Sequence, residues 1–261
     1  MSDLSFHVGN AADYPDYVRL FAELQIPDPP VPPEEWAAAW APHSLFLASG
    51  GSNVAYALAH AYGATAHVFH LAVDGAMRRK GLGSALFRAL GARLLQVGCT
   101  RVRLNVKAGN DAAIQLYAGL GLEVHHRAQV LRLPWSAAGH LPHGVADVRP
   151  VNPAEDAALE RRHDLLEGQI ARWRERDERL FVAAGGDGFA RFVPGLGAMP
   201  FCAPGTGCAR ALLEAMRPHA PPAASHLQLV IEAQDDLALA LRDAGATLLF
   251  EIFQMRGPMP R

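Results

Sequence analysis

The sequence lacks the features that mark secreted and membrane proteins. Its three cysteines, Cys99, Cys202 and Cys208, are odd in number and widely spaced, which argues against a disulfide framework and a structural zinc site and favours a reducing compartment. The N-terminus has no basic segment followed by an apolar run, so no secretory signal is expected. No stretch approaches the roughly 18 uninterrupted apolar residues of a transmembrane helix. We therefore expect a cytoplasmic protein with no membrane partner.

An excess of positive charge is also absent. The chain has 24 Lys and Arg against 26 Asp and Glu, a formal net charge of -2, so no global positive field attracts nucleic acid. Any phosphate site must be local, and we expect no nucleic-acid partner. The 12 histidines form no HxxxH or HxH set, and the adjacent His125 and His126 should diverge on a strand. No metal site is therefore predicted.

The chain does contain enough apolar sequence for two small cores. Its 261 residues, of which 50% are hydrophobic, suit two domains of about 130 residues better than one. Five prolines stand within residues 27–33 and predict a rigid connector between two helices, with a lid beside a pocket and a proline-rich ligand for a partner as alternatives.

Periodicity predicts strands and helices in the same order in both halves of the chain. The expected strands cover 45–48, 54–60, 67–73, 101–106 and 123–133, then 180–184, 189–193, 198–202, 226–231 and 247–255; the expected helices cover 11–25, 82–97 and 110–120, then 156–177, 210–216 and 235–242.

The second half repeats the first. Four residues at one helix recur 126 positions later, a fifth apolar residue matches a different apolar residue at the same distance, and a glycine recurs 124 positions later, which indicates an internal duplication. The segment 135–147 between the halves contains glycine and proline without an apolar period. We predict a first domain at 1–134, a linker at 135–147 and a second domain at 148–261. The matched residues are Gly81, Ala85, Leu86, Ala89, Leu90 and Gly121 with Gly207, Ala211, Leu212, Ala215, Met216 and Gly245.

The segment with the clearest chemistry is 71–86, in which a strand leads into Arg78-Arg79-Lys80-Gly81-Leu82-Gly83 and then into a helix. Glycines let the backbone close around an anion, and the N–H groups and dipole of a helix start favour negative charge. The three basic side chains add local positive charge. The turn therefore suits a pyrophosphate, and a helix start that needs only a tight turn is the alternative.

Two motifs resemble those of the GNAT (Gcn5-related N-acetyltransferase) superfamily. Arg78, Gly81 and Gly83 match its Q/R-x-x-G-x-G/A pattern. Further on, N-x-x-A-x-x-x-Y-x-x-x-G-F is matched by Asn110, Ala113, Tyr117 and Gly121, with Leu122 in place of Phe. The resemblance covers residues 40–133 and is weaker before them. It implies an α+β fold of α/β/α layers with two tandem GNAT-like domains, each a mixed, mostly antiparallel sheet that is flanked by helices and has a central strand splay.

The resemblance also implies a site. Acetyl-CoA would lie in the splay between strands 67–73 and 101–106, with the Val73 N–H on the thioester carbonyl and the Tyr117 hydroxyl protonating the departing thiolate. From periodicity alone, Tyr117 is a core aromatic. The residues expected to bind acetyl-CoA are Leu71, Val73, Arg78, Arg79, Lys80, Gly81, Gly83, Ser84 and Asn110.

The base that deprotonates the acceptor amine is less determined. Members of the superfamily often place it four residues before the leucine of the motif strand, which is His67 here. In an unbroken strand His67 shares a face with Leu71 and points into the splay, whereas His70 points away. A structural role for His67 is the alternative, and Glu23 and Glu35 are further candidates for the base.

The second copy loses the key groups, so an inert repeat is predicted, and anion binding by its Gly205-Thr206-Gly207 turn is left open. Aligned by the repeat, Arg78, Lys80, Asn110 and Tyr117 become Pro204, Thr206, Gln234 and Leu241.

Together these features predict an acetyl-CoA-dependent N-acetyltransferase, a monomer or homodimer, whose N-terminal domain acetylates a primary amine of a small molecule or peptide. Cys99 lies in neither motif, so direct attack by the amine is expected without a cysteine nucleophile. A non-catalytic acyl-CoA-binding protein with a regulatory or sensing role is the alternative.

Overall fold

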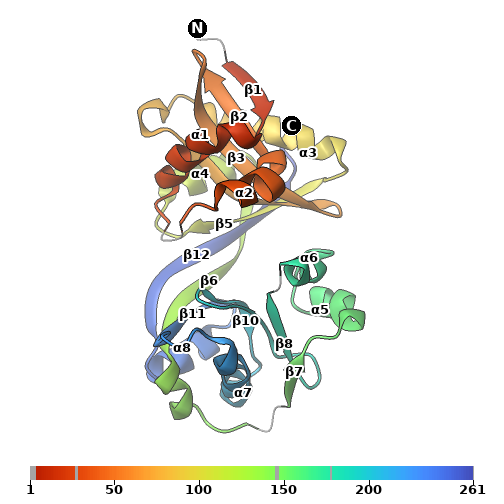
Figure 1. Ribbon diagram of the computed structural model, residues 1–261, viewed down its shortest axis with the longest axis vertical. Helices are drawn as coiled ribbons and strands as arrows, with labels where there is room; N and C mark the ends of the chain where they lie inside the picture. The colour runs from red at the N-terminus through yellow and green to blue at the C-terminus, as the bar shows by residue number, and fades with distance from the viewer. Residues whose placement is uncertain (1–3, 27–28, 145–146, 177, 261) are drawn as a thin grey trace. The chain divides into compact units, whose positions relative to one another are not determined.

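A computed structural model describes residues 4–26, 29–144, 147–176 and 178–260. Its helices and strands follow the order β-α-α-β-β-β-α-β-α-β twice (Figure 1), which confirms the predicted tandem α+β fold. Pro27, the first of the clustered prolines, lies outside the described residues. The first copy contains β1 (Leu4–Val8), α1 (Tyr14–Phe21), α2 (Pro33–Glu35), β2 (Ser44–Ser49), β3 (Ser52–Tyr62), β4 (Thr65–Val73), α3 (Leu82–Gln96), β5 (Arg101–Lys107), α4 (Asp111–Gly119) and β6 (Glu123–Pro134).

The second copy has the same ten elements, and its first four strands are shorter than those of the first copy. Within the described part of the chain, no helix is both long enough and apolar enough to cross a membrane. The elements are β7 (Val148–Pro150), α5 (Asp156–Arg162), α6 (Gln169–Glu175), β8 (Arg179–Ala183), β9 (Phe189–Val193), β10 (Gly197–Cys202), α7 (Thr206–Met216), β11 (His226–Glu232), α8 (Asp235–Asp243) and β12 (Thr247–Pro258).

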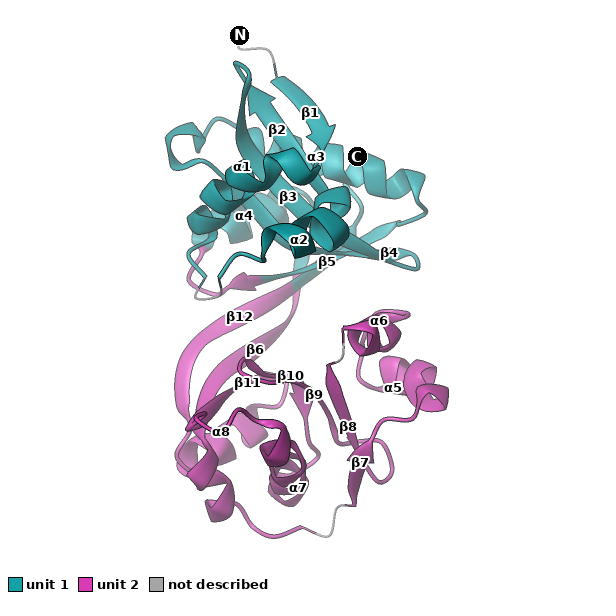
Figure 2. Cartoon of the chain, in the orientation of Figure 1, with its two compact units in different colours: residues 1–105, 111–123, 255–261 teal, residues 106–110, 124–254 magenta. Residues whose placement is uncertain are grey.

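The chain divides into two compact units whose boundaries differ from those predicted at 134 and 148 (Figure 2). Unit 1 comprises 1–105, 111–123 and 255–261, and unit 2 comprises 106–110 and 124–254. One reason is that residues 128–134 of β6 pair antiparallel with β11 inside unit 2. The other is that the end of the chain packs in unit 1, where the Met259 N–H donates to the Thr100 carbonyl at 2.9 Å.

The predicted linker is also partly structured. Its first residues, Trp135–His140, form a 3-10 helix, and Trp135, Ala138 and Leu141 are buried in the larger core of unit 2. Burial of these apolar side chains anchors the first part of the predicted linker in the core of unit 2, although Ser136, Gly139 and His140 are exposed. Residues 145 and 146 of the predicted linker lie outside the described residues.

Unit 1 is a sheet with helices on both faces. Its strands run in the order β1-β2-β3-β4-β5, followed by the last residues of β12. The helices α1 and α2 cover one face (Figure 1), where Tyr17, Trp36, Phe46 and Tyr56 are buried together. The parallel pairing of β4 with β5 extends only from Thr65 to Val68 of β4. Beyond that point the two strands separate, which confirms the predicted central splay.

Unit 2 has a core on each face of its sheet, whose strand order is β12-β6-β11-β10-β9-β8-β7. Successive side chains of β8 alternate between them, as the pleat requires. Phe181 packs with residues of α7 and α8, whereas Leu180 and Val182 pack with Ile170 and Trp173 of α6. The predicted single helix over 156–177 is two helices, α5 and α6.

Candidate functional site

The end of β4 directs backbone groups into the splay. The Asp74 N–H donates to the Val54 carbonyl of β3 at 2.9 Å, and hydrogen-bonded and non-hydrogen-bonded pairs alternate along an antiparallel ladder. Leu71 and Val73 therefore occupy non-hydrogen-bonded positions opposite β3. Their N–H and C=O groups point to the side of β5, beyond Val68, where β5 no longer pairs with β4. These are the groups that the sequence assigns to acetyl-CoA.

The turn after β4 leads into an open helix N-terminus. Gly81 is the N-cap of α3 with φ of 77°, a left-handed conformation that favours glycine, and a Cβ there would meet no atom within 4 Å. No side chain caps the helix, so its first N–H groups are available to an anion. The charged residues Arg79 and Lys80 are exposed beside it, and Ser84 is half-buried in the first helical turn.

Gly83 allows α3 to start close to its neighbours. A Cβ at this position would lie 3.4 Å from a methyl carbon of Leu116 in α4 and 3.8 Å from one of Val73. A larger residue would push the start of α3 away from the end of β4. The second glycine of the predicted motif therefore has a packing role beside the open helix N-terminus.

Arg78 turns back toward β4. Its Nε donates to the Val73 carbonyl at 3.2 Å and its Nη2 donates to Glu23 Oε2 at 2.6 Å. The Glu23 carboxylate also accepts from the Gly75 N–H at 3.3 Å. Glu23, one of the candidates for the base, is therefore engaged in holding the turn.

Tyr117 lies on the buried face of α4. Its ring centroid is 5.5 Å from that of Phe87 in α3, and burial raises the pKa of its hydroxyl well above the ordinary value. The hydroxyl is consequently protonated across the physiological pH range, as a hydrogen-bond donor must be. Asn110 directly precedes α4 in the chain and is exposed; its contacts place it in unit 2.

The prediction that His67 points into the splay is wrong, because β4 is not an unbroken strand. The register with β3 shifts by one residue and leaves Phe69 in a bulge. A bulge reverses the alternation of side chains beyond it. His67 and His70 therefore lie on the face covered by α1 and α2, and Leu71 and Val73 lie on the opposite face.

The environment of His67 makes it a weak base. Burial, with smaller contributions from Arg103 and His60, lowers the pKa of His67 to about 3, and its Nδ1 is buried without a hydrogen-bond partner. Burial lowers the pKa of His70 to about 4, and its Nδ1 shares a 3.0 Å hydrogen bond with the Tyr56 hydroxyl. Both imidazoles are neutral at pH 7 and have little affinity for the proton of an ammonium group.

Sequence reasoning missed the aromatic surroundings of these histidines. The ring centroid of His60 lies 5.1 Å from that of Phe69 and 4.5 Å from that of His43. Trp40 stacks on His70 at 5.9 Å and donates its Nε1–H to Glu35 at 3.0 Å, so this further candidate for the base is also engaged. The sequence shows histidines in both β3 and β4. Which of them lie opposite one another depends on the register between the two strands, which the sequence does not give.

The second copy keeps the helix but not the phosphate turn. The connection from β10 to α7 is 203–205, compared with 74–81 between β4 and α3, and it contains no basic residue. The N-cap glycines Gly81 and Gly205 are 124 apart, although buried residues such as Leu86 and Leu212 keep the predicted spacing of 126. The helix α7 thus begins two residues earlier than the predicted alignment implies.

The corresponding site in unit 2 carries the wrong charge for a phosphate. Gln234, which replaces Asn110, donates to the Ala203 carbonyl at 2.8 Å and accepts from the Ala203 N–H at 3.3 Å. Asp235 and Asp236 line the adjacent pocket. Carboxylates repel a pyrophosphate, and the lining contains no cation, although Arg127 pairs with Asp235 at 3.3 Å from outside it.

Comparison with known proteins identifies relatives of the first copy and of the whole fold. Residues 13–122 match the acetyltransferase (GNAT) family. Over 75 residues the chain is 39% identical to the ribosomal protein bS18-alanine N-acetyltransferase of Escherichia coli, a match to 29% of this chain and 51% of that protein. The chain therefore spans about half the length of the curated relatives it matches.

Two solved structures extend over both copies. A GCN5-related N-acetyltransferase from Sphaerobacter thermophilus has a TM-score of 0.68 at 17% identity and covers 99% of this chain and 96% of its own. A tandem GNAT protein from the clavulanic acid biosynthesis pathway has a TM-score of 0.60 at 17% identity, with 99% of each chain covered. At these identities the similarity establishes the fold.

Proposed function

We propose that this chain, whose residues 13–122 match the acetyltransferase (GNAT) family, transfers the acetyl group of acetyl-CoA to a primary amine in unit 1. The observation that carries the proposal is the splay of β4 from β5, which ends at the uncapped start of α3. Leu71 and Val73 offer strand-like hydrogen bonds to the pantetheine amides. Gly81, Arg79 and Lys80 offer N–H groups and positive charge to the pyrophosphate.

The reaction is a direct attack. The amine nitrogen forms a bond to the thioester carbonyl carbon, the C–S bond breaks, and its electron pair leaves with sulfur. Negative charge develops on the carbonyl oxygen, and we assign the Val73 N–H as its fixed donor. The Tyr117 hydroxyl donates a hydrogen bond to the departing sulfur. Because a thiol has a pKa of about 8.5 and the phenol a higher one, Tyr117 stabilises the thiolate without itself ionising.

The proton of the amine passes to solvent in this proposal and not to His67. The bulge at Phe69 turns His67 away from Leu71 and Val73, and its lowered pKa makes it a poor acceptor. We therefore assign His67 a positioning role: it packs against Phe69, which also contacts His60.

Acetyl-CoA titration and thiol release test the function. We expect one acetyl-CoA site per chain by calorimetry and CoA release with a primary amine, from a panel that includes a peptide with an N-terminal alanine. Tyr117→Phe should lower kcat by about 100-fold, the scale of losing one fixed donor to a developing anion, and leave acetyl-CoA affinity unchanged. Tyr62→Phe, which alters a buried tyrosine of β3, is the matched control.

The possible results distinguish the enzyme from the acyl-CoA-binding sensor and test the role of Tyr117 separately. Absence of acetyl-CoA binding would exclude the proposed function. Binding without CoA release on any amine would favour the acyl-CoA-binding sensor. An unchanged kcat for Tyr117→Phe would remove Tyr117 from the mechanism while leaving the enzyme assignment in place.

A further inference from the structure

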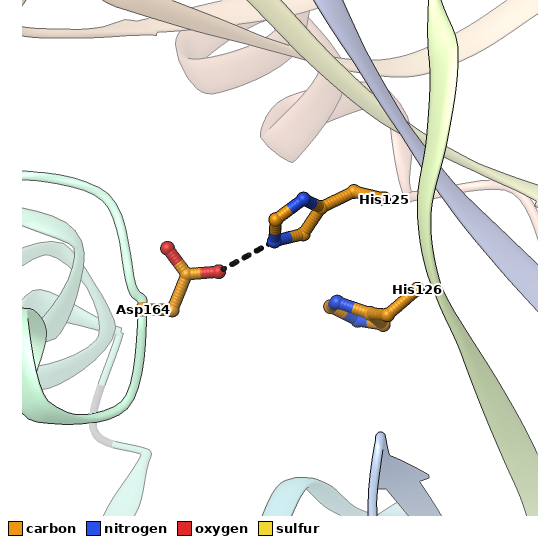
Figure 3. A group of neighbouring side chains, drawn as sticks. All are labelled: His125, His126 and Asp164. Carbon is orange, nitrogen blue, oxygen red and sulfur yellow. Dashed lines mark ion pairs between the residues drawn. The ribbon is translucent and has the colours of Figure 1, made fainter.

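Two adjacent histidines of β6 converge with an aspartate of the turn between α5 and α6 (Figure 3). One ligand atom from each of His125, His126 and Asp164 lies within 4.8 Å of the others, and within the described residues no other group of three or more such side chains meets this limit. The two rings do not diverge as the sequence predicted; their centroids are 5.4 Å apart at an interplanar angle of 58°. All three residues belong to unit 2.

The local structure explains why neighbouring side chains reach the same place. His125 and His126 lie near the start of β6, before its pairing with β11 begins at Ala128. Figure 3 shows both rings directed toward Asp164, which approaches from the opposite side. The distance from His125 Nε2 to Asp164 Oδ2 is 3.7 Å, longer than a hydrogen bond.

These distances fit a shared metal ion. Ligand atoms bound at about 2.0–2.2 Å in a tetrahedral site are about 3.4 Å apart, so the pair His125 and Asp164 is close to this separation. Small side-chain rotations would bring the third ligand, His126, to the same separation, because all three ligand atoms lie within 4.8 Å of one another. His126 Nε2 is buried without a hydrogen-bond partner, which is costly for a polar atom unless a ligand satisfies it. Glu232 Oε2 lies 3.5 Å from this nitrogen and adds negative charge beside the site, although it is outside the group whose ligand atoms all lie within 4.8 Å of one another.

The charges suit a dication. Two neutral imidazoles together with the carboxylates of Asp164 and Glu232 balance a charge of two. The neighbouring cation, Arg127, engages other carboxylates, those of Asp235 and Glu251, each at 3.3 Å. Imidazole and carboxylate donors favour borderline transition metals over Mg²⁺ or Ca²⁺.

We propose that His125, His126 and Asp164 bind one divalent transition-metal ion, with Zn²⁺ as the reference ion. The bound ion links the start of β6 to the turn that joins α5 and α6, so it stabilises unit 2 and takes no part in the acetyl transfer proposed for unit 1.

Metal titration of the chelator-treated full chain tests this site. We expect one equivalent of Zn²⁺ to bind by calorimetry and to raise the unfolding temperature. Co²⁺ should give visible absorption without a sulfur-to-cobalt band. His126→Gln and Asp164→Asn should each weaken Zn²⁺ binding at least tenfold. His143→Gln removes an exposed histidine outside the site and should leave the affinity unchanged.

The Asp164 variant keeps the test decisive if His126→Gln fails to fold, because the Asp164 side chain is 58% exposed. Zn²⁺ binding that neither variant weakens, or no saturable binding by the wild-type chain, would overturn the proposal. Acetyl-CoA binding measured on the same variants should match the wild type, which separates this site from the proposed function.

Discussion

Burial determines the protonation state of the titratable side chains near the proposed site. His67 and His70 are half-buried and pack against the rings of Phe69 and Trp40, so water solvates their charged forms less well there. The same effect acts in the opposite sense on Tyr117, whose neutral form is the protonated one. Burial therefore makes both histidines poor bases and the tyrosine a durable hydrogen-bond donor.

These two half-buried histidines should make stability depend on pH. Their folded-state pKa values of about 3 and about 4 lie below the unfolded value of about 6.5, so the unfolded chain binds the protons. Their contribution is complete above about pH 6.5 and is lost as pH falls toward these values. We expect the free energy of unfolding to fall by up to about 1.4 kcal/mol per pH unit for each histidine. His67→Gln should reduce this slope in urea unfolding between pH 6.5 and pH 4.5.

The exposed His143 provides the matched control, since His143→Gln should keep the wild-type slope. Equal slopes for wild type and His67→Gln would contradict the burial argument. The same variant also tests the positioning role of His67. Its kcat should fall less than tenfold without a shift in the pH profile, because losing a general base costs about 10²–10⁴.

At the scale of elements, one bulge and one turn shape the proposed site. The bulge at Phe69 separates the face that carries His67 from the face that carries Leu71 and Val73. The eight-residue connection 74–81 gives α3 an open N-terminus beside two exposed cations. The second copy has only 203–205 at this place, and the loss of phosphate chemistry there follows from this shortening and from the carboxylates of Asp235 and Asp236.

Glycines flank α3 at both ends, so a substitution at the proposed phosphate turn can be compared with one that introduces only backbone strain. Gly81 and Gly98 have φ of 77° and 91°, and at neither would a Cβ meet an atom within 4 Å. Gly81→Glu should weaken acetyl-CoA binding at least 100-fold in calorimetry, because it places a carboxylate at the proposed phosphate site. Gly98→Glu introduces similar strain but should leave the affinity unchanged. An equal loss in both variants would indicate that strain, and not the phosphate turn, is responsible.

At the scale of the whole molecule, each unit contains residues from both copies of the repeat. Unit 1 is completed by the last residues of the chain, where Met259 is 6% exposed. A Cβ on Gly91 of α3 would lie 2.7 Å from the Pro260 carbonyl oxygen, which shows how closely this segment packs. A fragment that ends at residue 134 lacks these contacts, so acetyl-CoA binding is properly measured on the full chain.

Met259→Ala should therefore destabilise unit 1. Truncating a buried methionine costs about 2–5 kcal/mol, and we expect a loss of this size in denaturant unfolding, although the residue lies far along the chain from the rest of unit 1. Leu239→Ala alters a residue that is 55% exposed and should change stability by less than about 0.5 kcal/mol. A Met259→Ala variant as stable as the wild type would show that unit 1 does not depend on the C-terminal segment.

The sequence by itself indicated the resemblance to the GNAT family that residues 13–122 match, the tandem repeat, the splay and the glycine turn. Each of these depends on local signals: strand and helix periodicity, Gly81 and Gly83 at fixed spacing, and Tyr117 at the right distance from Asn110. The tertiary structure alone decided the face on which His67 lies, the unit to which the chain end belongs, and the meeting of His125 and His126 with Asp164. A one-residue bulge inverts a face without altering periodicity, and pairing between distant segments is set by the packing of the whole sheet.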